Sequence, residues 1–481
     1  MKKSLKTLLI SLCVLSIASS SCIKASETSY PMFWTWMEDR EGFDLDSLFR
    51  HIDEAGIDGL MLYAPDNETY VKAAEMAKEH DVTLYAWIWT LNPRGDRQKL
   101  LEEHPDWFDV NRNGNSLKDF KAYVNSYKVL NAAVPEVREY VRDIVRNVCE
   151  IEGIEGICLD YCRFVDCVLP IGIGHRYGIL GDGEVRPEYD FGYHPVAIEK
   201  FKTEYSYDPR TKEDPTRDPQ WCEFRRRMIT EVANTAAEVA HEYGKKVTAS
   251  PFASTKIASF MVGQDFSKWN LDLVFPMVYT DFYTMEPGFV YDASRQNIET
   301  GNPETVQFCG LGAELGGNFN DLVECMDAAF TAGVQGISLY TVAGLETAEQ
   351  RGRFKEYADS LRKVKSAAGG VLTAQVRPEY VAEGGISIDP FKHPRLMAVV
   401  ERNIQRLIAG EEIHGKEMNG MSPDDPAKTY PALDLGEYEL VSSSDRMLVY
   451  RVTDKASGKS VEVFFPVYGD IISGWDVRPV S

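Results

Sequence analysis

Three short segments of the chain repeat one pattern, in which two glycines spaced three residues apart lead into an apolar run. The copies span residues 56–63, 153–160 and 333–340, and each follows a segment with helical periodicity. Side chains alternate along a strand, so one face of each copy carries leucine and isoleucine, and the other carries small or polar residues. In a barrel of parallel strands the first face packs on helices and the second points inward. This glycine repeat therefore indicates a barrel built from alternating strands and helices.

The inward face of each copy ends on a residue that should lie at the carboxyl rim of the barrel. That residue is Tyr63 in the first copy, Asp160 in the second and Tyr340 in the third. Barrels of this kind carry their reactive groups at this rim. Because only one copy places a carboxylate there, Asp160 is the first candidate for a catalytic residue. The two tyrosines are candidates for substrate contacts.

Strand-like and helix-like segments also alternate between the copies of the glycine repeat. Strands are expected at 31–37, 58–63, 82–89, 155–160, 246–251, 272–279, 305–310 and 335–341. Helices are expected at 44–55, 67–80, 135–150, 218–243, 319–331 and 346–366, with less regular helical segments at 256–269 and 288–300. Eight strands alternating with helices predict an α/β fold of the (β/α)8 TIM barrel type.

The predicted organisation has three parts. Residues 1–25 read as an export segment and residues 26–370 as the barrel, which ends at a Ser-Ala-Ala-Gly-Gly break. Residues 371–481 have a different pattern, in which 446–452 and 459–467 alternate like the two strands of a hairpin. They predict a smaller C-terminal accessory domain of α+β or mostly β structure.

The first residues have the features of an export signal. Basic residues precede an apolar run from Leu8 to Ala18, which is too short to span a membrane stably. Cys22 follows three serines and resembles a lipoprotein box, which predicts a lipid anchor; the alternative is an ordinary cleavage site after Ala25. In both cases we expect an exported protein, located in the periplasm or at the outer membrane or cell surface.

Charge and cysteine usage narrow the choice of partners. The formal net charge of -22 disfavours nucleic acid and favours a neutral or cationic ligand. Cys158, Cys162 and Cys167 cluster near Asp160, but their spacing matches no zinc pattern and no histidine pair accompanies them. Small buried thiols are expected there, with a Cys162–Cys167 disulfide as the alternative. Neither a metal nor another cofactor is predicted, and the oligomeric state is not readable.

Aromatic residues of two predicted strands suggest that the rim binds sugar. Trp34 and Trp36 lie on the first strand, while Tyr85, Trp87 and Trp89 share one face of the third. Aromatic rings stack on the apolar faces of sugars, although inward-facing rings can also simply fill a barrel. Tyr85 fits the filling role better. Trp34, Trp36 and Trp89 are therefore the candidates for sugar contacts.

Hydrolysis of a glycosidic bond needs two carboxyl groups flanking the scissile bond. Asp160 is the candidate nucleophile, and Arg163 on the same loop is expected to keep it ionised and to contact substrate. Asp281 is the candidate acid/base because it shares strand parity with Tyr279, itself a candidate substrate contact; Glu314, after the seventh strand, is the reserve. Weaker options for the second carboxyl are Glu38 and Asp66. The chain has no glycine-rich phosphate loop, Gly-x-Ser-x-Gly elbow or His-Glu-x-x-His helix.

Several stretches resemble the glycosyl hydrolase-like family ten barrels, a bacterial group distantly related to amylase-type barrels. The matching stretches are residues 130–140, 156–164, 263–265 and 272–279, with Trp221, residues 224–226 and Trp269. The similarity covers roughly residues 30–365, and Phe164-Val165 stands where the family usually has Tyr-Pro. The resemblance implies a glycosidase with a fourth-strand aspartate nucleophile, which is Asp160 here. It also implies an acid/base from a later strand, which fits Asp281 or Glu314.

The sequence thus predicts an exported glycoside hydrolase that acts on a poly- or oligosaccharide through two rim carboxylates. One alternative is a non-catalytic surface glycan-binding protein on a barrel scaffold, because a fold does not dictate a function. Another is a hydrolase of peptidoglycan glycan strands, since some relatives in the resembling family are implicated in trimming them.

Overall fold

The structure is a computed structural model that describes the greater part of the chain. The described residues are 30–39, 44–124, 126–169, 171–174, 177, 183–283, 287–313, 319–367, 391, 394–413, 430–436, 438–468 and 471–480. The export segment with Cys22 and Ala25, and the candidate Glu314, lie outside them.

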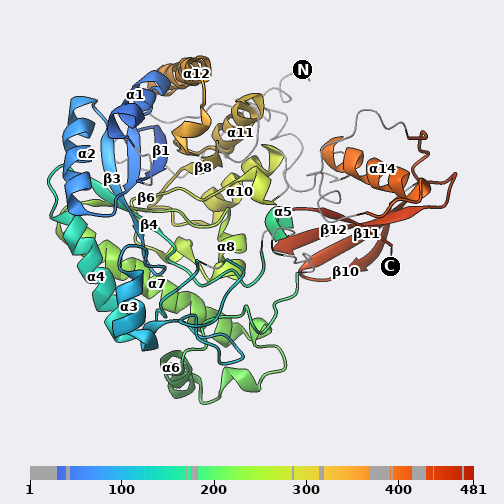
Figure 1. The fold of residues 1–481 in the computed structure, drawn as a ribbon, viewed down its shortest axis with the longest axis horizontal. Coiled ribbons are helices and arrows are strands. Elements are labelled where there is room, and N and C mark those ends of the chain that lie inside the picture. The colour runs from blue at the N-terminus through green and yellow to red at the C-terminus, as the bar shows by residue number, and fades with distance from the viewer. Residues whose placement is uncertain are drawn as a thin grey trace, which may run out of the picture.

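A curled sheet of seven parallel strands forms the centre of the N-terminal part (Figure 1). Its strands are β1 (Phe33–Glu38), β2 (Gly59–Tyr63), β3 (Thr83–Trp89), β4 (Gly156–Asp160), β5 (Lys246–Ala249), β8 (Cys309–Gly312) and β9 (Ile337–Tyr340). They pair in the order β5-β4-β3-β2-β1-β9-β8. Because every pair is parallel, the carboxyl ends of all seven strands meet at one edge of the sheet.

The strand ladder does not close between β5 and β8. Two short strands, β6 (Leu273–Val274) and β7 (Val306–Gln307), pair with each other in this gap. Single backbone hydrogen bonds connect them to the sheet, such as Phe275 N–H to the Ala249 carbonyl at 2.9 Å. Pro276 has no N–H to donate, which limits regular pairing beyond β6. The chain therefore has a TIM-barrel-like sheet rather than the continuous eight-stranded ladder that the sequence predicted.

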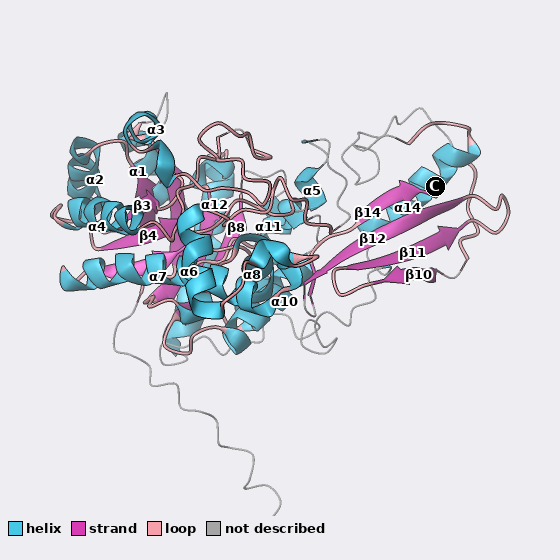
Figure 2. Ribbon diagram, turned by 90° about the horizontal axis from the view of Figure 1, so that it is seen from below, coloured by secondary structure: helices cyan, strands magenta, loops and turns pink. Residues whose placement is uncertain are grey.

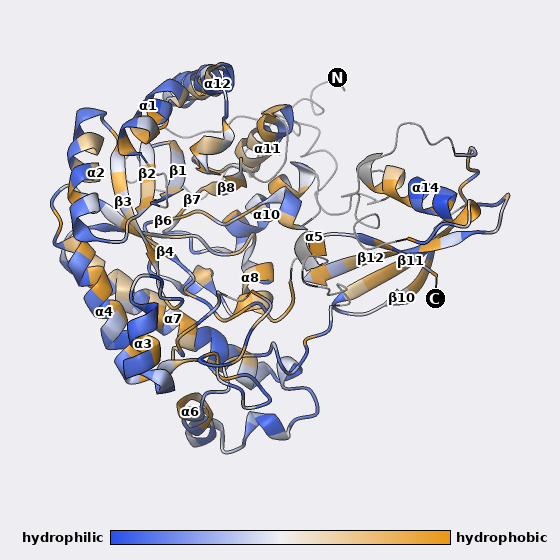
Figure 3. Cartoon of the chain, viewed as in Figure 1, coloured by the Kyte–Doolittle hydropathy of each residue, from blue (hydrophilic) through white to orange (hydrophobic). Residues whose placement is uncertain are grey.

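Helices cover the outer face of the sheet (Figures 1 and 2). The longer ones are α1 (Leu45–Ala55), α2 (Asn67–Glu79), α4 (Pro135–Cys149), α6 (Pro195–Tyr205), α7 (Pro219–Glu242), α10 (Pro287–Thr300), α11 (Phe319–Ala332) and α12 (Ala348–Ala367). Shorter ones are α3 (Arg97–Glu103), α5 (Ile171–Gly174), α8 (Thr255–Val262) and α9 (Thr280–Tyr283). Hydrophilic residues alternate with hydrophobic ones on these helices, so each can bury one side (Figure 3). Most of the longer helices bury it on the sheet, whereas α6 packs against α7 and α5 against α9. No helix among the described residues is both long and apolar enough to cross a membrane.

Each glycine of the repeat has its own structural role. Gly56, the first of its pair, ends α1 in the left-handed conformation with φ +64°, which glycine adopts without steric cost. Gly59, the second, lies against the ring of Trp34, and a Cβ atom there would come within 2.3 Å of it. Gly156 makes the same space for Tyr85, where a Cβ would lie 2.7 Å from the ring. The repeat therefore encodes a helix stop followed by a seat for an interior aromatic ring.

The predicted alternation of the two strand faces is confirmed. Leucine and isoleucine residues of the repeats belong to the core between sheet and helices: Leu60, Leu62, Ile157, Leu159, Ile337 and Leu339. A separate cluster fills the interior of the sheet: Trp34, Trp36, Met61, Tyr85, Trp87, Cys158, Leu273, Phe275 and Phe308. The interior is thus mostly aromatic, and Tyr63, Trp89 and Tyr340 pack at its edge.

The C-terminal part is an antiparallel sheet beside a helix. It contains β10 (Glu439–Ser443), β11 (Met447–Thr453), β12 (Ser460–Tyr468), β13 (Ile471–Ile472), β14 (Asp476–Pro479) and α14 (Pro394–Ile408). The predicted hairpin is the antiparallel β11–β12 pair, and this part has its own apolar core. The ring of Tyr468 also stacks on Phe260 of α8, with centroids 4.9 Å apart. The end of β12 is therefore buried against the barrel-like part.

Candidate active site

A cavity of about 230 Å³ lies at the carboxyl edge of the parallel sheet. Its position follows from four strand-terminal or near-terminal residues that line it: Glu38 of β1, Trp89 of β3, Asp160 of β4 and Tyr340 of β9. The remaining lining residues are Trp36, Trp87, Val124, Tyr127, Tyr161, Arg163, Asp166, Leu169, Ser250, Phe252, Met277, Tyr279, Phe282 and Tyr283. We call this the rim cavity. Its walls are mainly aromatic, with a few polar groups among them.

Asp160 is held in place by hydrogen bonds to both of its carboxylate oxygens. Its side chain is buried in the rim cavity, with 5% of its surface exposed. The indole N–H of Trp87 donates to Oδ2 at 3.0 Å, and the backbone N–H of Tyr161 donates to Oδ1 at 2.6 Å. Burial raises the pKa of Asp160 from 3.8 to about 6, although the Arg163 charge and both hydrogen bonds act in the opposite direction. The carboxyl group is therefore fixed in orientation and ionises near neutral pH.

The raised pKa of Asp160 predicts a pH-dependent stability difference. The folded-state pKa lies above the unfolded value, so ionisation of the buried carboxyl destabilises the fold above pH 6 and not below about pH 3.8. A rise from 3.8 to about 6 corresponds to roughly 3 kcal/mol. We therefore expect the unfolding free energy of the wild type to fall by roughly 3 kcal/mol, relative to that of Asp160→Asn, as the pH rises from 3.8 to about 6. Urea denaturation of both proteins across the window measures it, and a difference that does not change with pH would contradict it.

The residue after Asp160 has an unusual backbone conformation. Tyr161 lies in the left-handed region with φ +49°, which is uncommon for a residue other than glycine. Its ring packs on Trp89 with centroids 4.4 Å apart. Strained backbone of this kind concentrates at functional sites. Here it aims the Tyr161 N–H at the carboxylate of Asp160 and the ring at the cavity wall.

Arg163 pairs with Asp166 rather than with Asp160. Its Nη1 donates to Asp166 Oδ2 at 3.0 Å, and its Nη2 donates to the hydroxyl of Tyr127 at 3.1 Å. The guanidinium carbon lies 4.9 Å from the ring centroid of Tyr161 and is enclosed by further aromatic rings. The expectation that Arg163 keeps Asp160 ionised is therefore only partly met. Its charge lowers the pKa of Asp160, but the effect of burial is larger.

Four other predicted contact residues line the rim cavity: Trp36, Trp89, Tyr279 and Tyr340. Trp36 donates its indole N–H to Ser250 Oγ at 3.1 Å, which fixes the ring at the inner end of the cavity. The indole N–H of Trp89 is buried and has no hydrogen-bond partner among the described residues. These side chains come from three strands and the segment after β6, and the fold brings them together at the rim cavity.

Trp34 and Tyr63 do not reach the rim cavity, contrary to prediction. Trp34 is fully buried deeper in the sheet, where its indole N–H donates to the Pro31 carbonyl at 2.9 Å. It lies two residues before Trp36 on the inward face, so it fills the interior instead of the rim. Tyr63 packs behind Trp89 with ring centroids 5.9 Å apart.

Asp281 lies in a different place from the one its parity predicted. Thr280–Tyr283 form the short helix α9, so the alternation of a strand does not continue from Tyr279. Asp281 lines a separate cavity of about 40 Å³ and is not among the residues lining the rim cavity. The structure therefore does not bring it together with Asp160.

Several residues of the rim cavity were not identified from the sequence. Trp87 shares the inward face of β3 with Trp89, and that parity could have marked it as the partner of Asp160. Tyr127 and Asp166 come from long connecting segments, whose folding no periodic pattern predicts. Glu38, considered a weak option, lines the cavity and pairs with Arg94.

The cysteines near Asp160 are separate thiols. Cys158, Cys162 and Cys167 are buried and free, so the alternative disulfide between the last two is not formed. Burial raises the pKa of Cys158 to about 12, which leaves its thiol protonated at neutral pH. Within the described ranges, no group of three or more His, Cys, Asp or Glu side chains is placed to hold a metal ion.

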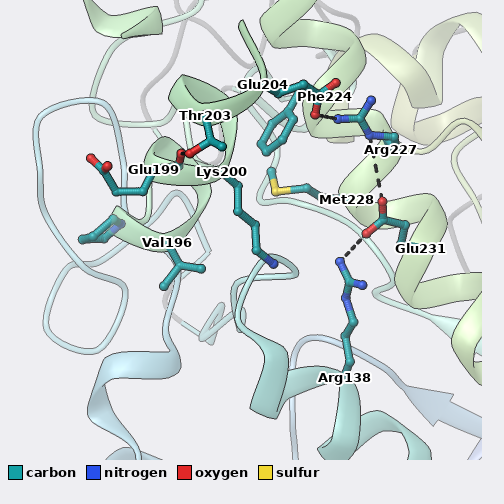
Figure 4. A pocket seen from close by; sticks show the side chains of 11 residues that line it. Arg138, Val196, Glu199, Lys200, Thr203, Glu204, Phe224, Arg227, Met228 and Glu231 are labelled. Atoms are coloured by element: carbon teal, nitrogen blue, oxygen red, sulfur yellow. Dashed lines mark hydrogen bonds and ion pairs between the residues drawn. The ribbon is translucent and has the colours of Figure 1, made fainter. Parts of the chain in front are cut away.

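A larger surface hollow of about 790 Å³ lies far from this chemistry, between α4, α6 and α7 (Figure 4). Its charged side chains are paired with one another: Arg138 with Glu231, and Arg227 with Glu204. Lys200 donates to the carbonyl of Ala133 at 2.6 Å. Because these groups satisfy each other, we place the functional site in the smaller rim cavity.

Fold and cavity together define a barrel-like α/β protein with a buried carboxylate in an aromatic-walled cavity at the carboxyl rim. No protein-family model matches the chain, and no curated protein sequence matches it. Similar solved structures include the GH36 α-galactosidase AgaA from Geobacillus stearothermophilus, with TM-score 0.40, 10% identity, and coverage of 91% of this chain and 48% of that one. The α-galactosidase from Lactobacillus brevis gives TM-score 0.40 and 10% identity, covering 92% and 46%.

Other similar structures include an α-amylase and a flavocytochrome. The α-amylase from Geobacillus thermoleovorans gives TM-score 0.36 and 12% identity, covering 90% of this chain and 86% of that one. Flavocytochrome b2 gives TM-score 0.33 and 9% identity, covering 74% and 70%. The chain spans about half the length of the α-galactosidases, 48% and 46%. These similarities assign neither a reaction nor a substrate, and the family resemblance noted in the sequence stays a prediction.

Proposed function

We propose that the protein is a glycoside hydrolase and that the rim cavity is its active site. The observation that carries the proposal is Asp160, a buried carboxylate fixed by two hydrogen bonds and surrounded by aromatic side chains. Aromatic rings suit the apolar faces of sugars, and a carboxylate suits the positive charge that develops at the anomeric carbon during glycoside cleavage.

In this proposal, Asp160 is the nucleophile of a retaining mechanism. With a pKa of about 6 it is largely ionised at neutral pH, and Trp87 and Tyr161 hold its two oxygens in place. A second carboxyl group must protonate the leaving oxygen. Among the described residues of the cavity, Asp166 is bound in a buried pair with Arg163. Glu38 pairs with Arg94, but that pair is partly exposed, at 21% and 32%, whereas the Arg163–Asp166 pair is buried. Glu38 is therefore the candidate acid/base that the cavity offers, and Glu314 remains a candidate outside the described residues.

The test is glycan release by the wild type and two matched variants, Asp160→Asn and Asp281→Asn. The panel holds plant, host and bacterial polysaccharides and peptidoglycan glycan strands stripped of peptides. We expect the wild type and Asp281→Asn to release sugar from the same substrate and Asp160→Asn to lose that activity. If none of the proteins releases sugar but all bind a glycan, the protein is a glycan-binding protein instead.

We also propose that the protein is exported and anchored by lipid at Cys22. The proposal rests on the basic and apolar residues before that cysteine. Incorporation of a labelled fatty acid, present in the wild type and absent in Cys22→Ser, tests the anchor. Labelling of both proteins would place the lipid elsewhere.

A further inference from the structure

We infer that the rim cavity takes one terminal sugar residue, so the enzyme removes single sugars from chain ends instead of cutting within a glycan. This inference rests on the proposed function, because it concerns how the same cavity meets its substrate. Three features of the cavity carry it: its size, the walls that surround it and the polar groups that line it.

The size of the cavity favours a small ligand. Its volume of about 230 Å³ lies below the ~300–1,000 Å³ of pockets that enclose drug-sized ligands. A glycan that is cut internally must place sugars on both sides of the reacting carboxylate. A cavity of this size has room for one ring, and the rest of the chain must lie outside it.

Segments from both halves of the sheet line the cavity around Asp160. Trp36 and Glu38 come from β1, Trp89 from β3 and Tyr340 from β9. The opposite side is formed by segments that follow the other strands: Arg163, Asp166 and Leu169 after β4, Ser250 and Phe252 after β5, and Tyr279, Phe282 and Tyr283 after β6. Asp160 itself is only 5% exposed, so the reacting group lies inside a pocket. A polymer can enter such a pocket with an end but not with its middle.

The polar groups of the cavity match a sugar that is not acidic. The charged groups that line the cavity are Glu38, Asp160, Arg163 and Asp166, and Glu38 pairs with Arg94. The Arg163 charge is matched by Asp166 at 3.0 Å, which leaves the charge of Asp160 to set the potential. A neutral or cationic terminal sugar therefore fits, and a uronic acid does not.

The experiment uses the substrate identified by the release panel, prepared as a short linear oligosaccharide. One batch is unmodified, and in a second the terminal sugar at the end that is attacked is chemically capped. We expect the full-length wild type to release only monosaccharide from the first batch at early times and to leave the capped batch uncut. A uronic acid placed at the same end should block release in the same way.

The outcomes separate this inference from the function on which it rests. A ladder of oligosaccharides, or cleavage of the capped batch, would overturn the single-sugar pocket while the hydrolase assignment stands. No product from the unmodified batch, although the panel released sugar from the same substrate, would overturn the single-sugar pocket alone. A panel that shows no release would remove the hydrolase assignment and this inference with it. Release of monosaccharide from uncapped chains alone supports both.

Discussion

Asparagine in place of Asp160 is expected to lower kcat/KM for glycoside hydrolysis by at least about 100-fold, or about 2.7 kcal/mol of transition-state stabilisation. The amide has nearly the shape of the carboxyl group, but its single oxygen can accept from Trp87 or from Tyr161 and not from both. What the variant lacks is the negative charge that attacks the anomeric carbon. The fold should persist, so the loss measures chemistry and not unfolding. Circular dichroism of the variant serves as the control.

The leaving group of the substrate distinguishes the two roles that Asp160 could have. A nitrophenolate leaves without protonation, so loss of a general acid spares aryl glycosides while loss of a nucleophile affects every substrate. For the nucleophile, we expect Asp160→Asn to be impaired on aryl glycosides as strongly as on the natural glycan. The acidic limb of the wild-type kcat/KM profile should then fall near pH 6, where Asp160 becomes protonated. Activity preserved on aryl glycosides alone would make Asp160 the acid.

Replacing Arg163 with methionine is expected to destabilise the fold by about 3–5 kcal/mol, because the substitution leaves a buried carboxylate without its partner. The side chains of Arg163 and Asp166 are 6% and 4% exposed, so water can replace little of the lost interaction. The variant also loses the contacts of the guanidinium with Tyr127, Tyr161 and Phe252. Urea denaturation at neutral pH measures the change in unfolding free energy.

The double variant Arg163→Met/Asp166→Asn is the control for this prediction. It removes both charges, so it should be clearly more stable than Arg163→Met alone. Two equally destabilised proteins would show that the loss comes from the aromatic contacts. A single variant as stable as the wild type would contradict the buried ion pair altogether.

The sequence was most informative where a strand repeats. The glycine repeat predicted both faces of the strands, and it placed Asp160 and Tyr340 at the carboxyl edge, where the structure has them. Parity also predicted the shared face of Tyr85, Trp87 and Trp89. These predictions depend on the alternation of side chains that the backbone of every strand imposes, so a single sequence is sufficient to make them.

The sequence was least informative where the chain leaves a strand. Thr280–Tyr283 turn into a helix after β6, which places Asp281 on another cavity from Tyr279. The partner of Arg163 is Asp166, three residues after it in the loop, and not Asp160, which lies three residues before it and was the expected partner. Trp34 lies on the inward face of its strand, as predicted, but too far from the carboxyl end of the strand to line the rim cavity. Parity gives the face on which a side chain lies and not its distance from the end of the strand. Contacts of this kind depend on tertiary packing, which leaves no period in the sequence.

The close contacts between interior aromatic rings and glycines limit which residues of the sheet can be substituted. Trp34 rests on Gly59, Tyr85 on Gly156 and Trp36 on Gly310, each so close that a methyl group would collide with the ring. A side chain at any of these three glycines would collide with the ring unless the ring is replaced as well, so the glycines resist single substitutions. Substitutions that change the preferred sugar can instead occur at the strand ends and in the loops after them, where Glu38 and Asp166 lie. New specificity can therefore arise in this lineage without altering the residues that specify its folding.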